Sequence, residues 1–227
     1  MKIAAIIPAA GRGKRLKTKK LKPFISVAGK PLLIHTLLNL KKSCRLEQII
    51  LAVPADQEKN FKELLKRYRL NNVLIVIGGR SRAESVRNGL EEVSDSCDWV
   101  LVHDAARPLV SKVVVKRLVQ CAKKTGGAIA ALPVTSTVKR VYPPTAEIAR
   151  TEDRGTLYLA QTPQLFKKKL LMDRYRVLGK KALAATDEAA LFDGSGVKVG
   201  IALGEARNIK ITTPEDIELF KFYLKKK

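Results

Sequence analysis

The first 46 residues of this 227-residue chain contain no acidic side chain, although twelve lysines and arginines occur among them. The chain also has only three cysteines, Cys44, Cys97 and Cys121, and aromatic residues make up 5% of it. Cysteines so few and so widely spaced indicate neither a disulfide framework nor a zinc site. No aromatic residue lies within residues 1–23, so this basic region lacks the stacking side chains typical of nucleic-acid surfaces. We therefore expect no nucleic-acid partner.

Long apolar runs are also missing from the sequence. No run approaches the roughly 18 residues that a membrane-spanning helix needs. Residues 3–10 are too short, and too soon followed by charge, for a secretory signal peptide, and no transit peptide is recognisable. We expect a cytoplasmic protein with no membrane partner, or a protein of the plastid stroma if the source has plastids.

Positive charge is abundant, because the chain has a net charge of +23 at pH 7. Such an excess favours anionic ligands, among them nucleotides, phosphorylated metabolites, nucleic acids and anionic membranes. Charge alone does not choose among these classes.

The first two thirds of the sequence alternate between strand and helix patterns, which predicts βαβ units on a parallel sheet. Apolar runs suited to buried strands lie at 3–7, 48–53, 73–77, 99–103 and 128–132. Helix patterns lie at about 31–42, 56–68, 81–92 and 111–124. The fold class is therefore α/β, with a doubly wound, mostly parallel, Rossmann-like sheet. Ligands of such sheets bind beyond the carboxyl ends of the strands.

The pattern changes between residues 135 and 161, where short β-like pieces surround Pro143 and Pro144. This stretch has no helix pattern and predicts a protruding β-arm. Helices are expected again at 167–178 and 187–193, strands at 197–203 and 207–211, and a final helix after its N-cap Thr213. We interpret residues 1–227 as one domain with residues 135–161 as its arm.

The first strand, residues 3–7, leads into Pro8-Ala-Ala-Gly-Arg-Gly-Lys-Arg15, followed by further lysines. Small residues let backbone N–H groups approach an anion, and the basic residues supply the countercharge. The segment thus resembles a polyphosphate cradle. It is not a P-loop, because Gly11 has no second glycine five residues later, and it lacks the third glycine of the dinucleotide fingerprint.

Several motifs occur in one order along the chain: Pro8-Ala-Ala-Gly-x-Gly-x-Arg15, Lys22, Gly78-Gly79-x-x-Arg82-x-x-Ser85, His103-Asp-Ala-Ala-Arg-Pro108, Gln161-Thr-Pro-Gln164, Thr186-Asp-Glu-Ala189 and Asn208-Ile-Lys-Ile-Thr212. The set resembles the 2-C-methyl-D-erythritol 4-phosphate cytidylyltransferases of the non-mevalonate isoprenoid pathway, over essentially the whole chain. The resemblance implies a nucleotide-diphospho-sugar transferase type of fold. It also implies transfer of CMP from CTP to methylerythritol phosphate, with release of pyrophosphate. The alternatives are a ribitol-5-phosphate cytidylyltransferase, whose family shares most of these motifs, and a non-catalytic basic module that binds nucleotides or nucleic acid.

The resemblance also implies roles for individual residues. Arg15, Lys22 and Lys210 match catalytic cations. The matches to the CTP site are Ala9, Ala10, Gly11, Gly13, Gly78, Gly79, Ser85 and Asp104. Asp104 also matches a ligand of the Mg²⁺ cofactor. The matches to the sugar-alcohol phosphate site are Arg107, Thr137, Arg154, Thr162, Thr186 and Lys210.

Two of these residues, Thr137 and Arg154, lie on the predicted arm. In the family the arm clasps a second subunit and delivers them into the neighbouring active site, so the resemblance implies a homodimer. His103 is expected to be structural, because direct attack by an ionised phosphate needs no proton transfer. His35 is expected to be structural because it lies in a helix pattern. Two departures from the family pattern are Pro23 after Lys22, where the family often has glutamine, and Arg80 after the glycine pair, where relatives can carry an acid.

Overall fold

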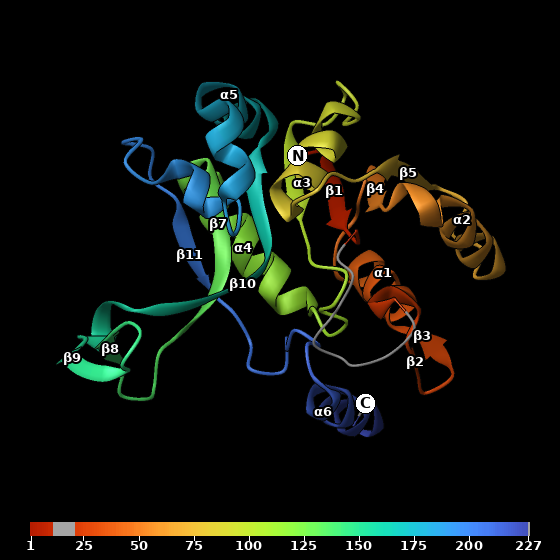
Figure 1. Ribbon diagram of the computed structural model, residues 1–227. Coiled ribbons are helices and arrows are strands. Elements are labelled where there is room, and N and C mark those ends of the chain that lie inside the picture. Colours follow the sequence, from red (N-terminus) through yellow and green to blue (C-terminus); the bar gives the residue numbers. More distant parts are fainter. Residues whose placement is uncertain (11–20, 227) are drawn as a thin grey trace.

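The computed structural model describes residues 1–10 and 21–226 of the chain. In this part of the chain the main sheet has seven strands in the order β11-β7-β10-β6-β1-β4-β5. Their bounds are β1 Ile3–Pro8, β4 Gln48–Val53, β5 Val73–Ile77, β6 Trp99–Val102, β7 Gly127–Pro133, β10 Tyr158–Lys167 and β11 Gly200–Leu203. β10 runs antiparallel to both of its neighbours, and the other pairs are parallel (Figure 1). The predicted mostly parallel sheet is confirmed.

Helices cover both faces of the sheet, as the doubly wound prediction requires. They are α1 Leu32–Ser43, α2 Glu58–Arg67, α3 Arg82–Glu91, α4 Lys112–Thr125, α5 Lys168–Leu178 and α6 Pro214–Lys225. Alternate residues of β1 separate the two cores, because successive side chains of a strand point to opposite faces. Ile3, Ala5 and Ile7 pack with α1, α2 and α4, whereas Ala4 and Ile6 pack with α3 and α5.

Helix α6 covers a smaller third core at the end of the molecule. Its Phe220 is fully buried with Leu32, Leu109 and Ile211. Thr213 caps the helix, and the Asp216 side chain accepts hydrogen bonds from the backbone N–H groups of Thr212 and Thr213. The predicted N-cap Thr213 is confirmed, and it fixes where the segment that carries Lys210 ends.

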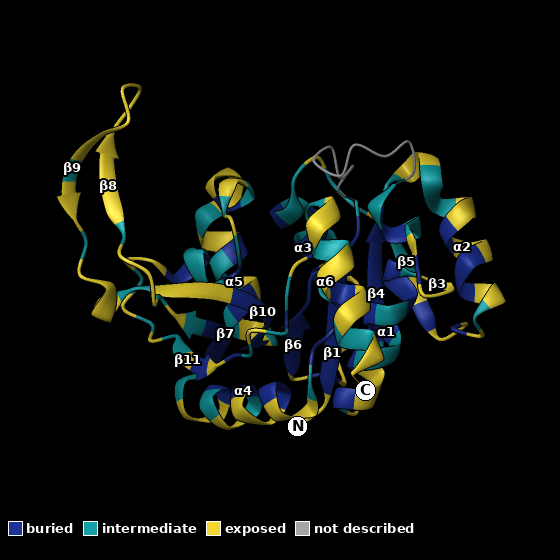
Figure 2. Cartoon of the chain, turned by 90° about the horizontal axis from the view of Figure 1, so that it is seen from below, coloured by how far each residue is buried: buried dark blue, intermediate teal, exposed yellow. Residues whose placement is uncertain are grey.

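The arm is a separate two-stranded sheet of β8, Lys139–Tyr142, and β9, Glu147–Thr151. It projects from the layered body and is mostly exposed (Figure 2). The backbone N–H of Val134 donates to the carbonyl of Leu157 and closes its base. The predicted end of the arm at residue 161 is wrong, because Tyr158, Leu159 and Ala160 pair with β7 in the main sheet.

Two other predicted elements differ from the structure. Residues 207–211 do not form a strand: Asn208 closes a turn with Glu205, and Ile211 points its side chain into the core under α6 instead of joining a sheet. The helix expected at 187–193 is the short 3-10 helix η6, Ala189–Phe192. The remaining small elements are β2 Ser26–Val27, β3 Lys30–Pro31 and the 3-10 helices η2 Lys22–Phe24, η3 Ala55–Gln57, η4 Arg154–Thr156 and η5 Gly179–Ala184. No helix in the described part of the chain has the length and apolar character that crossing a membrane requires.

Candidate active site

The carboxyl ends of β1, β4, β5 and β6 meet at one edge of the sheet because these strands are parallel. A cleft of about 320 Å³ opens there, between the segments that follow β1, β5 and β6. Seven of the sequence-predicted site residues line it: Ala9, Ala10, Lys22, Gly79, Ser85, Asp104 and Lys210. Gly11, Gly13 and Arg15 lie outside the described residues. The edge of the sheet thus gathers residues that are up to 201 positions apart in the sequence.

The glycine pair after β5 passes close to the start of α3. A Cβ on Gly78 would lie 2.9 Å from the Ser85 hydroxyl oxygen, and one on Gly79 would lie 2.1 Å from Cγ of Glu84. The Gly79 N–H donates to the Ser85 hydroxyl (3.1 Å), which in turn donates to the carbonyl of Ser81 (2.9 Å). Close packing therefore favours glycine at position 78, next to the short side chains of Ala10 and Ser85, whereas at position 79 the Glu84 side chain would have to move.

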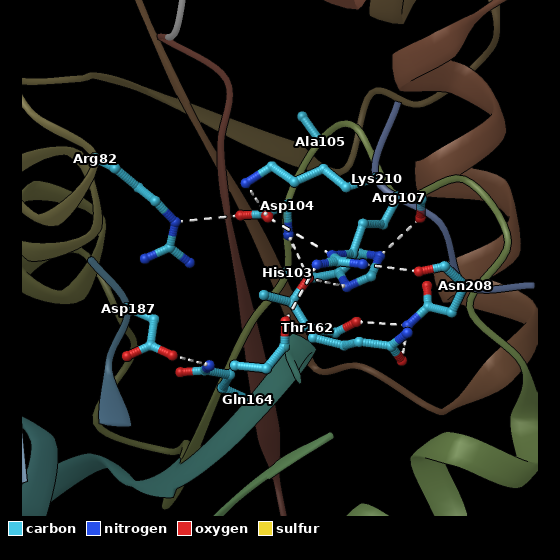
Figure 3. Close-up of polar contacts among 12 residues, drawn as sticks. Arg82, His103, Asp104, Ala105, Arg107, Thr162, Gln164, Asp187, Asn208 and Lys210 are labelled. Atoms are coloured by element: carbon cyan, nitrogen blue, oxygen red, sulfur yellow. Dashed lines mark hydrogen bonds and ion pairs between the residues drawn. The ribbon is translucent and has the colours of Figure 1, made fainter. Parts of the chain in front are cut away.

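Asp104, directly after β6, is the electrostatic centre of the cleft (Figure 3). Its Oδ1 accepts from Nε of Arg82 (3.1 Å), and its Oδ2 lies 2.7 Å from Nζ of Lys210 and 3.7 Å from Nε of Arg107. Burial raises the pKa of Asp104, but Arg82, Lys210 and Arg107 together lower it by more, so the pKa of this carboxyl lies well below its usual range. Asp104 is ionised at neutral pH and contacts Arg107 of its own segment together with two cations from distant segments, Arg82 and Lys210.

His103 and Thr162 hold the backbone of this segment in place. Nε2 of His103 faces the carbonyl oxygen of Arg107 (3.0 Å), which only accepts, so this nitrogen carries the proton. Burial lowers the pKa of His103 to about 4, so the ring is neutral and Nδ1 accepts from the Thr162 hydroxyl (3.1 Å). The Thr162 oxygen then accepts from the N–H of Asp104 (3.0 Å). The donor and acceptor of each of these three hydrogen bonds are thus assigned, which agrees with a structural role for His103.

Asn208 joins this arrangement to the segment that carries Lys210. Asn208 is fully buried, and its side-chain Nδ2 donates to the backbone carbonyl of Thr162 (2.8 Å). The backbone carbonyl of Asn208 accepts from Nη1 of Arg107 (2.8 Å). The guanidinium of Arg107 is therefore held between Asn208 and Asp104. Lys210, two residues later, keeps 40% of its side chain exposed toward the cleft while touching Asp104.

Six predicted site residues in the described part of the chain do not line the cleft: Gly78, Arg107, Thr137, Arg154, Thr162 and Thr186. Thr137 and Arg154 are exposed on the arm, where Nη1 of Arg154 donates to the Thr135 carbonyl (2.6 Å). Thr186 is exposed in the loop before η6. Thr162 is 4% exposed, and its hydroxyl is engaged within the protein.

The motif reading gave no role to Arg82 or Glu188, which the structure places beside Asp104. Arg82 lines the cleft and also binds the buried carboxylate of Glu188 through both terminal nitrogens (2.7 and 3.0 Å). Burial lowers the pKa of Arg82, but Glu188 and Asp104 raise it by more, whereas burial keeps the pKa of Glu188 above its usual value. We treat the pair as ionic, because arginine stays protonated and each terminal nitrogen meets a carboxylate oxygen. The only sequence signal was their presence in two of the motifs.

Comparisons with known proteins agree with this arrangement. A family model described as 2-C-methyl-D-erythritol 4-phosphate cytidylyltransferase matches residues 3–226. The protein of that name from Syntrophus aciditrophicus is 38% identical over 227 residues, covering 99% of this chain and 97% of its own length. The bifunctional enzyme IspD/IspF of Desulfotalea psychrophila is 43% identical over 224 residues; the match covers 99% of this chain but 57% of the bifunctional enzyme.

Solved structures give the same answer. The crystal structure of 4-diphosphocytidyl-2C-methyl-D-erythritol synthase from Anaerococcus prevotii superposes with a TM-score of 0.85 at 32% identity, over 99% of this chain and 98% of that one. The family match spans both the cleft and the arm, so it covers every motif on which the resemblance depends. The chain is a member of the 2-C-methyl-D-erythritol 4-phosphate cytidylyltransferase family.

Proposed function

We propose that the cleft binds CTP and 2-C-methyl-D-erythritol 4-phosphate and transfers CMP between them. A phosphate oxygen of the sugar alcohol attacks the α-phosphorus of CTP and forms the new P–O bond. The bond from the α-phosphorus to the bridging oxygen breaks on the opposite side, and pyrophosphate leaves with that electron pair. The attacking phosphate is already ionised, so no side chain has to remove a proton.

The observation that carries the proposal is the cation cluster around Asp104. Arg82, Arg107 and Lys210 come from three segments and meet one carboxylate at the edge of the cleft. Two anionic substrates repel each other strongly at bonding distance, even at an effective dielectric constant near 20. Fixed cations remove that barrier without having to reorganise during the reaction.

On the nucleotide side, Ala9 and Ala10 are proposed to approach the phosphates of CTP, with Gly11 and Gly13 continuing the cradle. Gly78, Gly79 and Ser85 are proposed to face cytosine. The amino donor and carbonyl acceptor of cytosine suit backbone groups together with a hydroxyl. Asp104 is proposed to lie between the base-binding wall and the phosphates.

The catalytic groups in this proposal are Arg15, Lys22 and Lys210, which stabilise the charge on the pentacoordinate phosphorus. Lys22, at the start of η2, and Lys210 both line the cleft. Arg107, Thr186 and Lys210 are proposed to receive the phosphate and hydroxyl groups of the sugar alcohol. Thr162 contributes to the same site by holding Asp104.

The donor set fits Mg²⁺ that is shared with the nucleotide. In the described part of the chain, no three His, Cys, Asp or Glu side chains come together to hold a metal by themselves. Mg²⁺ typically takes one or two carboxylates together with substrate phosphates and water. The ionised Asp104 would supply that carboxylate, and the ion would neutralise phosphate charge during transfer.

The arm is proposed to complete the site of a second subunit in a homodimer, with residues 1–227 as one domain. Tyr142 and Ile148 are 61% and 65% exposed on the arm. A hairpin that leaves such side chains in water gains stability by packing against another surface. Thr137 and Arg154 would then reach the substrate phosphate in the pocket of the partner subunit.

The reaction is tested by measuring pyrophosphate release from CTP with 2-C-methyl-D-erythritol 4-phosphate and, separately, with ribitol 5-phosphate. Release with the first substrate and not the second is expected, because the family model, the Syntrophus aciditrophicus protein and the Anaerococcus prevotii structure are named for methylerythritol. Replacing CTP by UTP should lower turnover, because uracil presents an acceptor where cytosine presents an amino donor. CTP binding without pyrophosphate release from either alcohol would instead indicate a non-catalytic nucleotide-binding module.

A further inference from the structure

Glu188 is the most deeply buried acidic group near the cleft, yet it does not line it. Its side chain is 1% exposed, and both carboxylate oxygens accept from the terminal nitrogens of Arg82. The two residues are 106 positions apart in the sequence. A two-point contact between a guanidinium and a carboxylate fixes the plane of both groups.

The loop that carries Glu188 is itself anchored to the main sheet. Oε1 of Gln164, on β10, accepts from the backbone N–H groups of Glu188 (3.1 Å) and Ala189 (3.2 Å). Nε2 of the same side chain donates to Asp187 (2.8 Å), whose other oxygen accepts from the N–H of Ala190 (3.0 Å). Gln164 thus holds the loop at three points.

The remaining nitrogen of Arg82 closes a ring of contacts. Its Nε donates to Oδ1 of Asp104 (3.1 Å), and Asp104 stands two residues after Val102, the β6 residue that pairs with Gln164. The contacts therefore run from Gln164 to Glu188, to Arg82, to Asp104 and back to the sheet. Because Nε, Nη1 and Nη2 of Arg82 each donate to a carboxylate oxygen, its guanidinium cannot turn without breaking one of these contacts.

We propose that Glu188 is a positioning residue: it holds Arg82 so that Nε faces Asp104, and it fixes the loop on which Thr186 stands. Thr186 lies two residues before Glu188 and is proposed above to bind the sugar-alcohol phosphate, so this inference rests on the proposed function. Without Glu188 the two terminal nitrogens of Arg82 turn toward the substrate phosphates. Asp104 then loses its fixed partner, and both substrates bind in a less productive geometry.

The test is Glu188→Gln, which keeps the shape of the side chain and one acceptor but removes the charge. Small misplacements of reacting groups are costly, so we expect kcat to fall about 10- to 100-fold. KM for 2-C-methyl-D-erythritol 4-phosphate should rise about fivefold or more, because the loop of Thr186 shifts. The matched control is Glu205→Gln, since Glu205 accepts from Ser111 and touches neither Arg82 nor Asp104.

A second variant separates positioning from stability. Glu188→Gln leaves the half-buried Arg82 with one anion fewer and lowers Tm, whereas Arg82→Gln combined with Glu188→Gln removes both charges and should recover most of that loss. The double variant should stay as slow as the single one, with the same raised KM.

Recovery of kcat together with Tm in the double variant would show a purely structural role and overturn the inference. So would a Glu188→Gln enzyme with normal kcat and KM, or one whose kcat falls only with its folded fraction while KM stays unchanged. A wild-type chain that releases no pyrophosphate would instead overturn the proposed function itself.

Discussion

The carboxyl edge of the sheet and the β8–β9 arm both carry residues of the proposed site, but they hold them in opposite ways. At the edge, Asp104 is 6% exposed and contacts three cations of its own chain. On the arm, Arg154 is exposed and its side chain contacts the carbonyl of Thr135 on the same arm. One region is pre-organised by its own chain, and the other presents its residues outward. The residues at the edge can therefore be interpreted from a single chain, whereas the role proposed for the arm has to be tested with a second subunit.

The largest effect is expected from the edge. Lys22→Ala should lower kcat by about 100-fold or more, because it removes a fixed charge that acts on the transition state. The fold should persist, so the melting temperature should stay near that of the wild type. Steady-state kinetics beside a melting curve measure both quantities. Lys30→Ala, an exposed lysine on β3, is the matched control; equal activity of the two variants would remove Lys22 from catalysis.

Mixing subunits tests the arm directly. Arg154→Ala should be nearly inactive by itself, and so should Lys22→Ala. A mixed dimer has one pocket with both residues intact, and half of the dimers are mixed after random exchange, so about a quarter of the wild-type activity should return. Subunit exchange is verified first with two different tags. If verified mixed dimers stay inactive, Arg154 acts within its own chain or has no role in the reaction.

A smaller effect is expected when the hydrogen bonds of Thr162 to Asp104 and His103 are removed without removing a charge. Thr162→Val takes away the hydroxyl and leaves the N–H of Asp104 and Nδ1 of His103 without their partner. A buried unsatisfied polar group costs about 1–3 kcal/mol, so both stability and kcat should fall, with kcat lower by about tenfold. Thr162→Ser keeps the hydroxyl and should stay within about threefold of the wild type. Equal losses in the two variants would show that the methyl group, and not the hydroxyl, is what matters.

The smallest effect is expected far from both regions, at the cap of α6. Hydrogen bonds from Thr212 and Thr213 lower the pKa of Asp216, although burial partly opposes this. Asp216→Ala should reduce the free energy of unfolding by about 1 kcal/mol at pH 7. Because the folded pKa is depressed, this contribution is present above the unfolded pKa of about 4 and is lost as the pH falls below it. Denaturant titrations at pH 7 and pH 3 should therefore show the difference between variant and wild type shrinking in acid; a constant difference would contradict the ionic cap.

Local patterns in the sequence predict the parallel strands and the helices well, because apolar periodicity and capping residues are local signals. The five strands expected before residue 133 all form, and Thr213 caps α6 as predicted. The antiparallel insertion of β10 between β6 and β7 is not a local property. Its first residues, Tyr158 and Leu159, fall within the stretch predicted to be the arm but pair with β7. Strand partners depend on tertiary contacts that a run of residues does not carry.

The same distinction between local sequence signals and tertiary contacts applies to the candidate site. Lys22, Asp104 and Lys210 could be placed in one cleft because each stands in a recognisable motif, and the cleft contains all three. The pairing of Arg82 with Glu188 could not be predicted, since an ion pair between residues 106 positions apart leaves no pattern along the chain. The direction of the hydrogen bonds through His103 likewise required the carbonyl of Arg107 to be located.

The register of strand β10 also determines where residues can be inserted into the chain. It leaves the base of the arm at residue 158 and reaches Thr162 and Gln164 within seven residues. A residue inserted between 158 and 162 would shift the following side chains to the opposite face of the sheet. The turn between β8 and β9, at residues 143–146, belongs to a sheet of its own, so a longer loop there would leave the register of β10 unchanged.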